Sequence, residues 1–350
     1  MKKDTQIRFG LIGCGRIAPR HAESIVNLKR AKLEAVCDIE KKKALDFAEE
    51  WKVQKVYYNY LNLLEDPDID VVSICTPNGL HAPMGIDAAK AQKHALIEKP
   101  IATNSTVADK LITAFKKHRK KLFVVKQVRY NPAVVKVREV IKKGKLGKII
   151  SCALTMRWTR PDEYFKQSPW RGTKQMDGGA LLTQGIHYLD LLQWFFGPVE
   201  KIMAKTDRLG HKNIEIEDVV SAILKFKSNA LGTIEFTICT YPHNLECSLT
   251  VLGEKGSIKI GGDAVNEIEL WKVKNMRKPK ISDGLKPNVY AGGMYQGSCP
   301  NHIFVYRDLI ATLLDKKPVK VDGKEARKSL EIAMAIYRSS ELGREVSLPL

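Results

Sequence analysis

One short run of this sequence combines residue types that could take part in proton transfer. The apolar segment Ala95–Ile97 is typical of a buried strand, and Glu98, Lys99 and Pro100 follow it directly. An ion pair is costly inside a sheet, and proline, which cannot donate to the ladder, often ends a strand. A buried lysine can have its pKa lowered enough to exchange protons, whereas a neighbouring carboxylate acts the other way. These residues indicate a polar corner at the end of a strand.

A second candidate for chemistry is a helical run in the later half of the sequence. Thr183 and His187 are four residues apart and Asp190 follows three further on, a spacing that places them on one helical face. A lone helical histidine is more often structural than catalytic, so the spacing alone leaves both roles open. The opposite side carries an apolar stripe that would anchor the helix, formed by Leu182, Ile186, Leu189 and Phe196.

The sequence Gly-Cys-Gly-Arg-Ile-Ala at residues 13–18 follows a strand-like run and opens a helical one. It fits the GxGxxG/A pattern, in which glycines allow a tight turn and a close approach of the backbone to a pyrophosphate. The helix N-terminus also favours that negative charge. We therefore predict a dinucleotide-binding turn that includes Gly13, Gly15, Arg16 and Ile17.

Asp38 ends the second strand-like run, 23 residues beyond Gly15, where a carboxylate can hold the ribose hydroxyls of adenosine. Its alternative role is to cap the following helix. A carboxylate at this position repels the 2′-phosphate of NADP, so the predicted cofactor is NAD and NADP is disfavoured. Lys41–Lys43 would soften this preference if they faced the cofactor, but in a first helical turn they are expected to face solvent.

Two further polar clusters end buried strand-like runs. Thr76, Pro77 and Asn78 end one, with His81 three residues on, and the Glu98–Pro100 corner ends the next. In an open parallel sheet, ligands bind beyond the carboxyl ends of the strands. Both clusters are therefore expected to face the same crevice as the glycine turn, which accounts for polar residues at the end of a buried strand.

The order of the elements predicts a fold that can position these residues. The first 126 residues alternate strand-like and helical runs, which predicts right-handed crossovers and a parallel, doubly wound sheet. Long strand-like runs with tight turns then predict an open, mostly antiparallel sheet, with one helix over 179–196 and an exposed loop over 272–300. The expected fold class is α/β, with a Rossmann domain at 1–126 and an α+β domain at 127–350.

The composition is that of a soluble globular protein, with 44% hydrophobic and 28% charged residues. No run approaches the roughly 18 apolar residues of a membrane span. The formal charge of +19 comes from scattered lysines and arginines, so we predict no nucleic-acid partner but a steering effect on anionic small substrates. Seven cysteines without a CxxC pair predict free thiols in a reducing cytoplasm, with no zinc or other metal.

Several motifs resemble the glucose–fructose oxidoreductase/inositol dehydrogenase (Gfo/Idh/MocA) family over essentially the whole chain. They are GCGRIA, TPNGLH, EKPIA, the helix containing GIHYLD and the ending SSELGREVSLPL. The resemblance implies that Lys99 and His187 are catalytic, that His187 accepts the proton or shares that role with Lys99, and that the Lys99–Pro100 peptide is often cis. It also implies contacts to the cofactor from Thr76, Pro77, Asn78, His81, Glu98, Lys99 and Gln127.

Within the family, the sharper resemblance is to enzymes that oxidise UDP-N-acetylglucosaminuronic acid at C3, before transamination in bacterial surface-polysaccharide pathways. It rests on QVRYNPAV (127–134), MRWTRPDEYFKQSPWRGT (156–173), DGGALLTQGIHYLDLLQW (177–194) and SCPNHIFVYRDLI (298–310). Family members frequently carry Asp, and this subgroup often Asn, where this chain has Thr183, which leaves Thr183 as a hydrogen-bonding candidate. Arginines bind phosphate and carboxylate oxygens bidentately and aromatic rings stack on sugars or uracil, although the same residues would also suit a basic surface loop. The substrate-binding candidates are Arg157, Arg160, Tyr164, Trp170, Arg171, Thr173, Thr183 and His187.

The expected protein is an NAD-dependent sugar dehydrogenase of the cytoplasm. His187, assisted by Lys99, would take the proton of a secondary alcohol while the hydride passes to the cofactor. The alternatives are a myo-inositol or simple aldose dehydrogenase, whose substrates are neutral, and a non-catalytic NAD(P)-binding regulator, which would be expected to lack the lysine or the histidine. By resemblance alone, a homodimer or homotetramer is expected through the antiparallel sheet.

Overall fold

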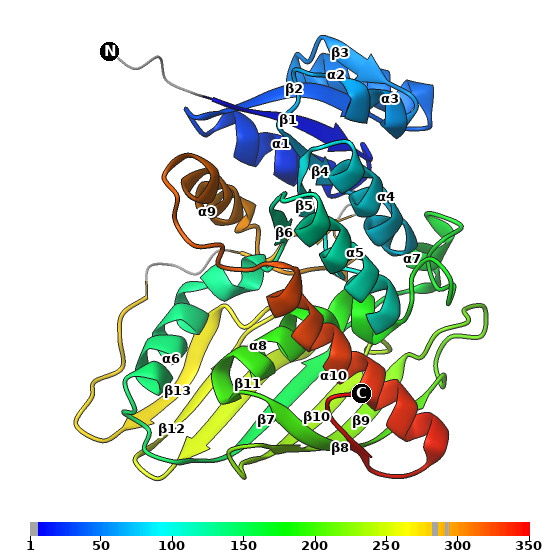
Figure 1. Cartoon of the computed structure of the whole chain (residues 1–350). Coiled ribbons are helices and arrows are strands. Elements are labelled where there is room, and N and C mark those ends of the chain that lie inside the picture. Colours follow the sequence, from blue (N-terminus) through cyan, green and yellow to red (C-terminus); the bar gives the residue numbers. More distant parts are fainter. Residues whose placement is uncertain (1–5, 282–285, 291–292, 294) are drawn as a thin grey trace. The chain divides into compact units, whose positions relative to one another are not determined.

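The computed structural model describes residues 6–281, 286–290, 293 and 295–350 and divides into two compact units (Figure 1). The first unit comprises the residues up to Lys126 together with His302–Arg327. The second unit comprises Gln127–Asn301 and Lys328–Leu350. The sequence predicted one boundary between domains, after residue 126. The structure differs from this prediction, because His302–Arg327 belongs to the first unit.

The returning segment joins the first unit through side-chain and backbone hydrogen bonds. The hydroxyls of Tyr306 and Ser73 lie 2.7 Å apart, and the Val124 amide donates to the Val321 carbonyl at 3.2 Å. Such contacts span about two hundred residues of sequence, and local patterns cannot reveal them.

The first unit contains a six-stranded sheet in the order β3-β2-β1-β4-β5-β6, in which all neighbouring strands are parallel. Its central strands are apolar and buried, as the sequence predicts for a sheet covered on both faces. The short edge strand β3 was not predicted, because its three residues are half-buried and too few to show a pattern. The strands are β1 (Ile7–Ile12), β2 (Ala31–Cys37), β3 (Lys55–Tyr57), β4 (Val71–Ile74), β5 (His94–Ile97) and β6 (Leu122–Val124).

The helices of the first unit follow the strands in alternation, as predicted. The side chain of Asn104 accepts a hydrogen bond from the Val107 amide at 3.0 Å and so caps α5. Helix α4 begins at Asn78 with Pro83 inside it, whereas the sequence indicated a helix only from Met84. The helices are α1 (Ala18–Val26), α2 (Lys41–Trp51), α3 (Tyr60–Glu65), α4 (Asn78–Lys90), α5 (Ser105–Lys117) and α9 (His302–Leu314).

The second unit contains an eight-stranded sheet in the order β13-β12-β11-β7-β10-β9-β8-β16. Only β7 and β10 pair in parallel, so the prediction of a mostly antiparallel sheet is confirmed. Strands β8 and β13 were missed, because charged residues alternate with the apolar ones on their exposed faces. The strands are β7 (Ile149–Arg157), β8 (Val199–Asp207), β9 (Val219–Phe226), β10 (Leu231–Thr237), β11 (Glu246–Gly253), β12 (Gly256–Gly261), β13 (Glu267–Val273) and β16 (Val346–Ser347).

Figure 1 shows α6 and α8 of the second unit covering one face of this sheet. The helix predicted over 179–196 is divided into a π-helical turn, η2 (Leu181–Gly185), and α8 (Ile186–Phe196). The loop predicted over 272–300 contains the hairpin β14 (Val289–Tyr290) and β15 (Tyr295–Gln296), and its residues 282–285, 291–292 and 294 lie outside the described part. The remaining helices are η1 (Gln127–Tyr130), α6 (Pro132–Lys142), α7 (Asp162–Lys166) and α10 (Gly323–Leu342), which begins in the first unit and ends in the second.

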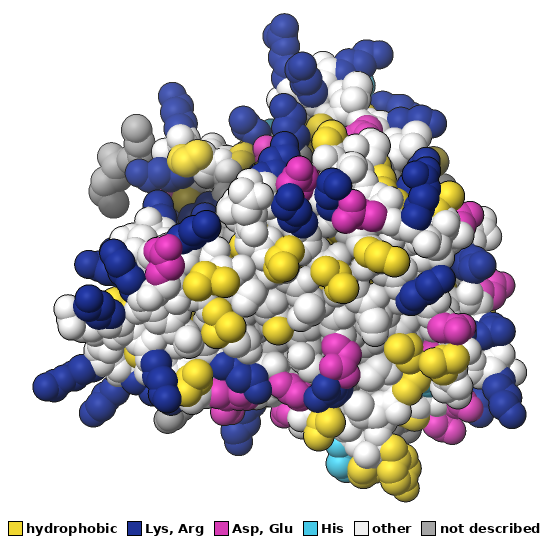
Figure 2. Space-filling view, turned by 90° about the horizontal axis from the view of Figure 1, so that it is seen from below, with side chains coloured by type: hydrophobic (Ala, Val, Ile, Leu, Met, Phe, Trp, Pro, Cys, Tyr) yellow, Lys and Arg dark blue, Asp and Glu magenta, His cyan; other side chains and the backbone are white. Residues whose placement is uncertain are grey.

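The surface and the thiols agree with expectations from the composition. In the view of Figure 2, Lys and Arg side chains are spread over the visible face rather than gathered over one element. All seven cysteines are free, and only Cys239 is classed as exposed. In the described part of the chain, no helix combines the length and the apolar character needed to cross a membrane.

A buried ion pair fixes α8 within the second unit. Arg129 of η1 donates from Nε and Nη2 to the two carboxylate oxygens of Asp190, at 2.6 and 2.8 Å. Both residues are buried, and the Arg129 guanidinium lies 4.8 Å from the ring centre of Trp194. A bidentate pair constrains the orientation of both partners, so it fixes the helix that carries His187.

We expect Asp190→Ala to lower the free energy of unfolding by about 3–5 kcal/mol, because it leaves the Arg129 charge buried without its carboxylate. The matched control is Glu139→Ala, which removes an exposed ion pair to Lys136 and is expected to change stability by at most about 1 kcal/mol. Urea denaturation followed by circular dichroism measures both. Equal losses in the two variants would contradict this account of α8.

Candidate active site

The glycine turn after β1 has the geometry of a cofactor cradle. Gly13 has φ +95°, and a Cβ atom there would lie 2.9 Å from the carbonyl carbon and oxygen of Cys75, so only glycine fits. Around Gly15, by contrast, a Cβ atom would meet nothing within 4 Å. Exposed Arg16 and half-buried Ile17 then lead into α1. The open space beside Gly15 at a helix N-terminus fits the close approach of a pyrophosphate.

Asp38 lies at the end of β2, as predicted, and its carboxylate also organises the glycine turn. One oxygen accepts the Cys14 amide at 2.9 Å and the other accepts the Glu40 amide at 2.9 Å. The predicted alternative, a capping role, is therefore partly present, because Glu40 directly precedes α2. Burial, together with the Asp38 charge, raises the pKa of the Cys14 thiol to about 12, so this cysteine stays protonated.

The turns after β4 and β5 are tied together by His81. Its Nδ1 lies 2.7 Å from the Pro100 carbonyl oxygen and its Nε2 lies 2.9 Å from the Thr76 carbonyl oxygen. Because both ring nitrogens face backbone oxygens and the side chain is buried, we correct the prediction that His81 contacts the cofactor. The histidine instead sets the distance between two strand ends.

The Thr76–Asn78 turn retains polar atoms that fit a ligand. The Thr76 hydroxyl is buried, and no residue in the described ranges pairs with it. Pro77 is half-buried and Asn78, buried at 5% exposure, opens α4. An unpaired buried hydroxyl is costly, so its presence at this strand end is consistent with a bound cofactor.

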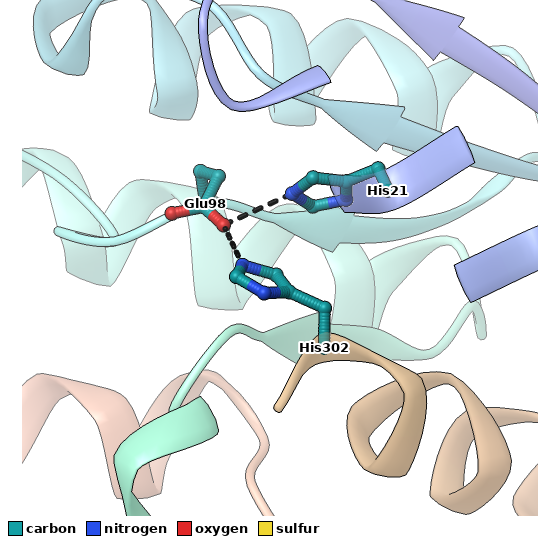
Figure 3. Close-up of side chains that lie close together, drawn as sticks. All are labelled: His21, Glu98 and His302. Carbon is teal, nitrogen blue, oxygen red and sulfur yellow. Dashed lines mark hydrogen bonds and ion pairs between the residues drawn. The ribbon is translucent and has the colours of Figure 1, made fainter. Parts of the chain in front are cut away.

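Glu98 is buried and its carboxylate is occupied by groups of its own unit (Figure 3). One oxygen lies 3.0 Å from His21 Nε2 and 3.2 Å from His302 Nε2, and the other accepts the Lys99 amide at 3.1 Å. Burial raises the pKa of Glu98, but the hydrogen bonds from the two histidines outweigh it and hold the pKa well below its usual value. These bonds hold the carboxylate within its own unit, and the cofactor contact of Glu98 stays a prediction. The half-buried Lys99 follows, and the Lys99–Pro100 peptide is cis, as the resemblance implied.

His187 lies on α8 with 3% of its surface exposed. Its Nε2 is 3.4 Å from the side-chain nitrogen of Gln127, which also donates to the Ser298 hydroxyl at 3.0 Å. Gln127 was predicted to contact the cofactor, and within the second unit the structure places it beside His187. An imidazole nitrogen that faces an amide N–H accepts the hydrogen bond through its lone pair, so this contact orients the ring of His187 within the second unit.

Two residues that lie close to His187 in the sequence, Asp177 and Gln184, were not predicted to take part in the site. The hydroxyl of Thr183 donates to the carboxylate of Asp177, whose other oxygen accepts the Gly172 amide at 2.8 Å. Gln184 donates to the Tyr164 hydroxyl at 3.0 Å. Asp177 thus places a buried carboxylate behind Thr183.

Two arginines of the predicted substrate loop surround an aromatic ring. The guanidinium carbons of Arg160 and Arg171 lie 5.5 and 4.3 Å from the ring centre of Tyr164. Arg160 also lies 4.9 Å from the ring centre of Trp158 and 5.0 Å from that of Tyr295, and Arg171 lies 4.8 Å from that of Trp170. Such stacking holds the planar guanidinium groups in place, and Nη1 of Arg160 also donates to the Thr159 carbonyl oxygen at 2.6 Å.

Arg157 does not belong to this group. It pairs with Glu235 at 2.6 Å and with Glu246 at 3.1 Å on neighbouring strands. Side chains alternate along β7, so Arg157 projects from the face opposite to buried Met156. We therefore correct its predicted substrate contact. The hydroxyl of Thr173 donates to the Trp170 carbonyl at 2.7 Å and closes a turn, so its predicted substrate contact has no support from its position.

Comparison with known families identifies the chain. The profile described as "Oxidoreductase family, NAD-binding Rossmann fold" matches residues 7–126, and the "GFO/IDH/MocA C-terminal domain" matches residues 134–259. The chain therefore belongs to the Gfo/Idh/MocA family of NAD-binding oxidoreductases.

Solved structures and curated relatives agree with this assignment. The chain is 36% identical to the WlbA dehydrogenase of Bordetella pertussis, solved with NADH and UDP-GlcNAcA, with a TM-score of 0.88 and 99% of each chain covered. It is 37% identical to the WlbA dehydrogenase of Chromobacterium violaceum, solved with the same two ligands, with a TM-score of 0.89 and 100% and 98% of the chains covered. It is also 28% identical to the myo-inositol 2-dehydrogenase of Thermotoga maritima over 98% of both chains.

The two glycines of the cofactor turn allow a matched test of the cradle. We expect Gly13→Ala to lower stability by about 1–3 kcal/mol because of its positive φ and the close Cys75 carbonyl. Gly15→Ala should leave the stability of the free protein unchanged, because no atom lies near the added methyl group. It should nevertheless weaken NADH binding at least about tenfold, roughly 1.4 kcal/mol. Unchanged NADH binding by Gly15→Ala would contradict the cradle, and thermal denaturation with fluorescence titration gives both values.

Asp38→Asn should shift the cofactor preference toward NADP, because it removes the charge that opposes a 2′-phosphate and keeps one acceptor oxygen for the loop. We expect the ratio of kcat/KM for NAD to that for NADP to fall by about tenfold or more, roughly 1.4 kcal/mol. A wild-type protein that prefers NADP would already exclude this role of Asp38.

Proposed function

We propose that the protein is an NAD-dependent dehydrogenase that oxidises the C3 hydroxyl of UDP-N-acetylglucosaminuronic acid, for the biosynthesis of a surface-polysaccharide sugar. The proposal is supported by two relatives at 36% and 37% identity that cover the whole chain and were solved with NADH and UDP-GlcNAcA. Both were solved with the two ligands together, which associates this substrate class with the fold at this level of similarity.

The observation that carries the proposal is the pair of arginines around Tyr164. Each guanidinium is a permanent cation with a planar set of donors, and a nucleotide-sugar acid offers a diphosphate and a carboxylate to such groups. Arg160 is 4% exposed, and its Nη1 donates to the Thr159 carbonyl oxygen at 2.6 Å, which fixes this cation within the second unit. A neutral polyol would not require two such residues.

The chemistry assigned to the chain's own residues is proton transfer and orientation. When bound, NAD accepts the hydride from the alcohol carbon. We assign His187 as the residue that takes the hydroxyl proton, with the side-chain amide of Gln127 beside its Nε2 atom. Lys99 assists as the second proton-transfer group, and Thr183, backed by Asp177, orients the substrate through its hydroxyl.

The second candidate is a myo-inositol or simple aldose dehydrogenase. Full-length similarity to a myo-inositol 2-dehydrogenase at 28% identity favours it. Its substrate is neutral, so it leaves the stacked arginines of the second unit without a role. We therefore rank it below the nucleotide-sugar proposal.

We further propose a homodimer or homotetramer. Apolar side chains lie exposed on the outer face of the second unit's sheet, where Met203 and Ile223, paired across β8 and β9, are 52% and 59% exposed and Leu231 of β10 is 55% exposed. An apolar group on a sheet face is typical of a surface covered by another copy.

A substrate panel tests the proposed function. The protein is mixed with UDP-N-acetylglucosaminuronic acid, UDP-N-acetylglucosamine, myo-inositol or glucose, each with NAD and with NADP, and the absorbance of the reduced cofactor is followed in single-turnover and multiple-turnover modes. We expect a reaction with the uronate and NAD, and little with its uncharged-sugar analogue, which lacks the carboxylate. Faster oxidation of myo-inositol would favour the second candidate.

The active-site assignment predicts strongly non-additive mutations. Lys99→Ala and His187→Ala should each lower turnover by about 10²–10⁴-fold, and the double variant should be little worse than the poorer single one. NADH binding should survive in all three, because the glycine turn is intact. The control, His243→Ala, removes an exposed loop histidine and should retain normal turnover. Near-normal turnover by His187→Ala would show that His187 only packs within the second unit.

A further inference from the structure

Beneath the Glu98–Pro100 corner lies a chain of buried polar groups that the proposed function does not use. The hydroxyl of Ser73 lies 2.7 Å from that of Tyr306, which lies 2.8 Å from His21 Nδ1. His21 Nε2 then reaches Glu98 at 3.0 Å, and His302 Nε2 reaches the same carboxylate oxygen at 3.2 Å (Figure 3). Every member is at most 4% exposed. The residues come from β4, α9, α1 and the turn after β5.

The hydrogen bonds of this chain fit one consistent arrangement of protons. Glu98 is ionised, so both histidines donate their Nε2 protons to it. His21 Nδ1 then accepts the proton of Tyr306, and the Tyr306 oxygen accepts the proton of Ser73. Burial lowers the pKa of His302, so this histidine remains neutral while it donates. No two donors face each other along the chain.

The same three side chains, two histidines and a carboxylate, could also surround a metal ion. A metal would require both Nε2 atoms to lose their protons, which moves the proton of His302 to Nδ1. That nitrogen is buried and has no partner among the residues that the structure describes, so a proton on it would be an orphaned donor. The observed distances of 3.0 and 3.2 Å lie within the range of ordinary N–H···O hydrogen bonds. The geometry therefore favours a hydrogen-bonded cluster over a metal site.

We propose that His21 and His302 are positioning residues that fix the Glu98 carboxylate, and through it the backbone of Lys99, for the oxidation reaction. The inference rests on the proposed function in one respect, the role of Lys99. The link is direct, because the Glu98 oxygen that the histidines leave free accepts the Lys99 amide at 3.1 Å. Because the rings of His21 and His302 hold one oxygen of Glu98, its carboxylate cannot rotate. The other oxygen then fixes the backbone from which the Lys99 side chain extends.

His302 also lies where the chain passes from the second unit to the first. On the near side, Asn301 is buried in the second unit and donates to the side chain of Asn131 at 2.7 Å. His302, the next residue, bonds Glu98 in the first unit. Asn301 is therefore held in the second unit by its side-chain hydrogen bond, and His302 is held in the first unit by its own. His302 does more than pack as part of α9.

The test compares His302→Leu with His302→Gln. The glutamine side-chain nitrogen can replace Nε2 as a donor to Glu98, whereas leucine fills similar space without a donor. We expect His302→Leu to lower kcat by about tenfold to a hundredfold, with the KM for the sugar and the Kd for NADH within about twofold of wild type. His302→Gln should recover most of kcat. The control is His94→Leu at the opposite end of β5, where a half-buried histidine accepts one backbone amide, and its kcat should be normal.

Four outcomes would overturn the inference. The first three are a normal kcat in His302→Leu, a loss of kcat in His302→Gln equal to that in His302→Leu, and the same loss of kcat in His94→Leu. The fourth is one metal ion per chain in the purified wild-type protein that is absent from His302→Leu. Thermal denaturation identifies a variant that has simply unfolded, and His302→Gln then decides the question.

A second readout separates this inference from the proposed function. If the wild-type protein oxidises none of the panel, the proposed function fails, and the rate of reductive methylation of Lys99, followed by peptide mass spectrometry, takes the place of kcat. We expect that rate to change at least about threefold in His302→Leu, roughly 0.65 kcal/mol, and to match wild type in His302→Gln. An unchanged rate in both variants would overturn the positioning role.

Discussion

The central strands of the first unit are buried on both faces and mostly apolar, and this constraint favours polar side chains beyond the strand ends, although buried Ser73 lies within β4. Gly13 follows β1, Asp38 follows β2, Thr76 follows β4 and Glu98 follows β5. The polar groups at these strand ends must form hydrogen bonds with neighbouring residues or with a ligand. Asp38 is satisfied by loop amides and Glu98 by two histidines, whereas the Thr76 hydroxyl has no partner among the described residues and the space beside Gly15 is open. We expect the cofactor to bind beside these last two groups.

The second unit must hold one histidine, His187, in helix α8, which is apolar nearly all round. Most residues of α8 are buried, and two of its polar residues, His187 and Asp190, face side chains from outside the helix. Arg129 holds Asp190, Gln127 faces His187, and Asp177 receives Thr183 through the π-helical turn that precedes the helix. Because Arg129 and Gln127 lie on η1 and Asp177 lies in the loop before η2, rotation of α8 would break several contacts together. This arrangement gives His187 a fixed orientation in a buried setting.

The sequence was most informative where function depends on local spacing. Gly13, Gly15 and Asp38 lie within one strand–helix–strand segment, so their pattern alone indicated a dinucleotide site. Arg157 was misjudged although the signal was available, since the alternation of Cys152, Leu154 and Met156 places it on the other face of β7. His302 and Asp190 could not be assigned in this way. Their partners, Glu98 and Arg129, are 204 and 61 residues away, and no local pattern encodes such pairings.

The central claim is that this chain transfers a hydride from one particular carbon of a nucleotide-sugar acid to NAD. The most direct measurement uses UDP-N-acetylglucosaminuronic acid that carries deuterium only at C3, with mass analysis of the reduced cofactor after a single turnover. The account predicts that the cofactor gains one deuterium and that the reaction slows relative to the unlabelled sugar. A reduced cofactor without deuterium, at an unchanged rate, would contradict it.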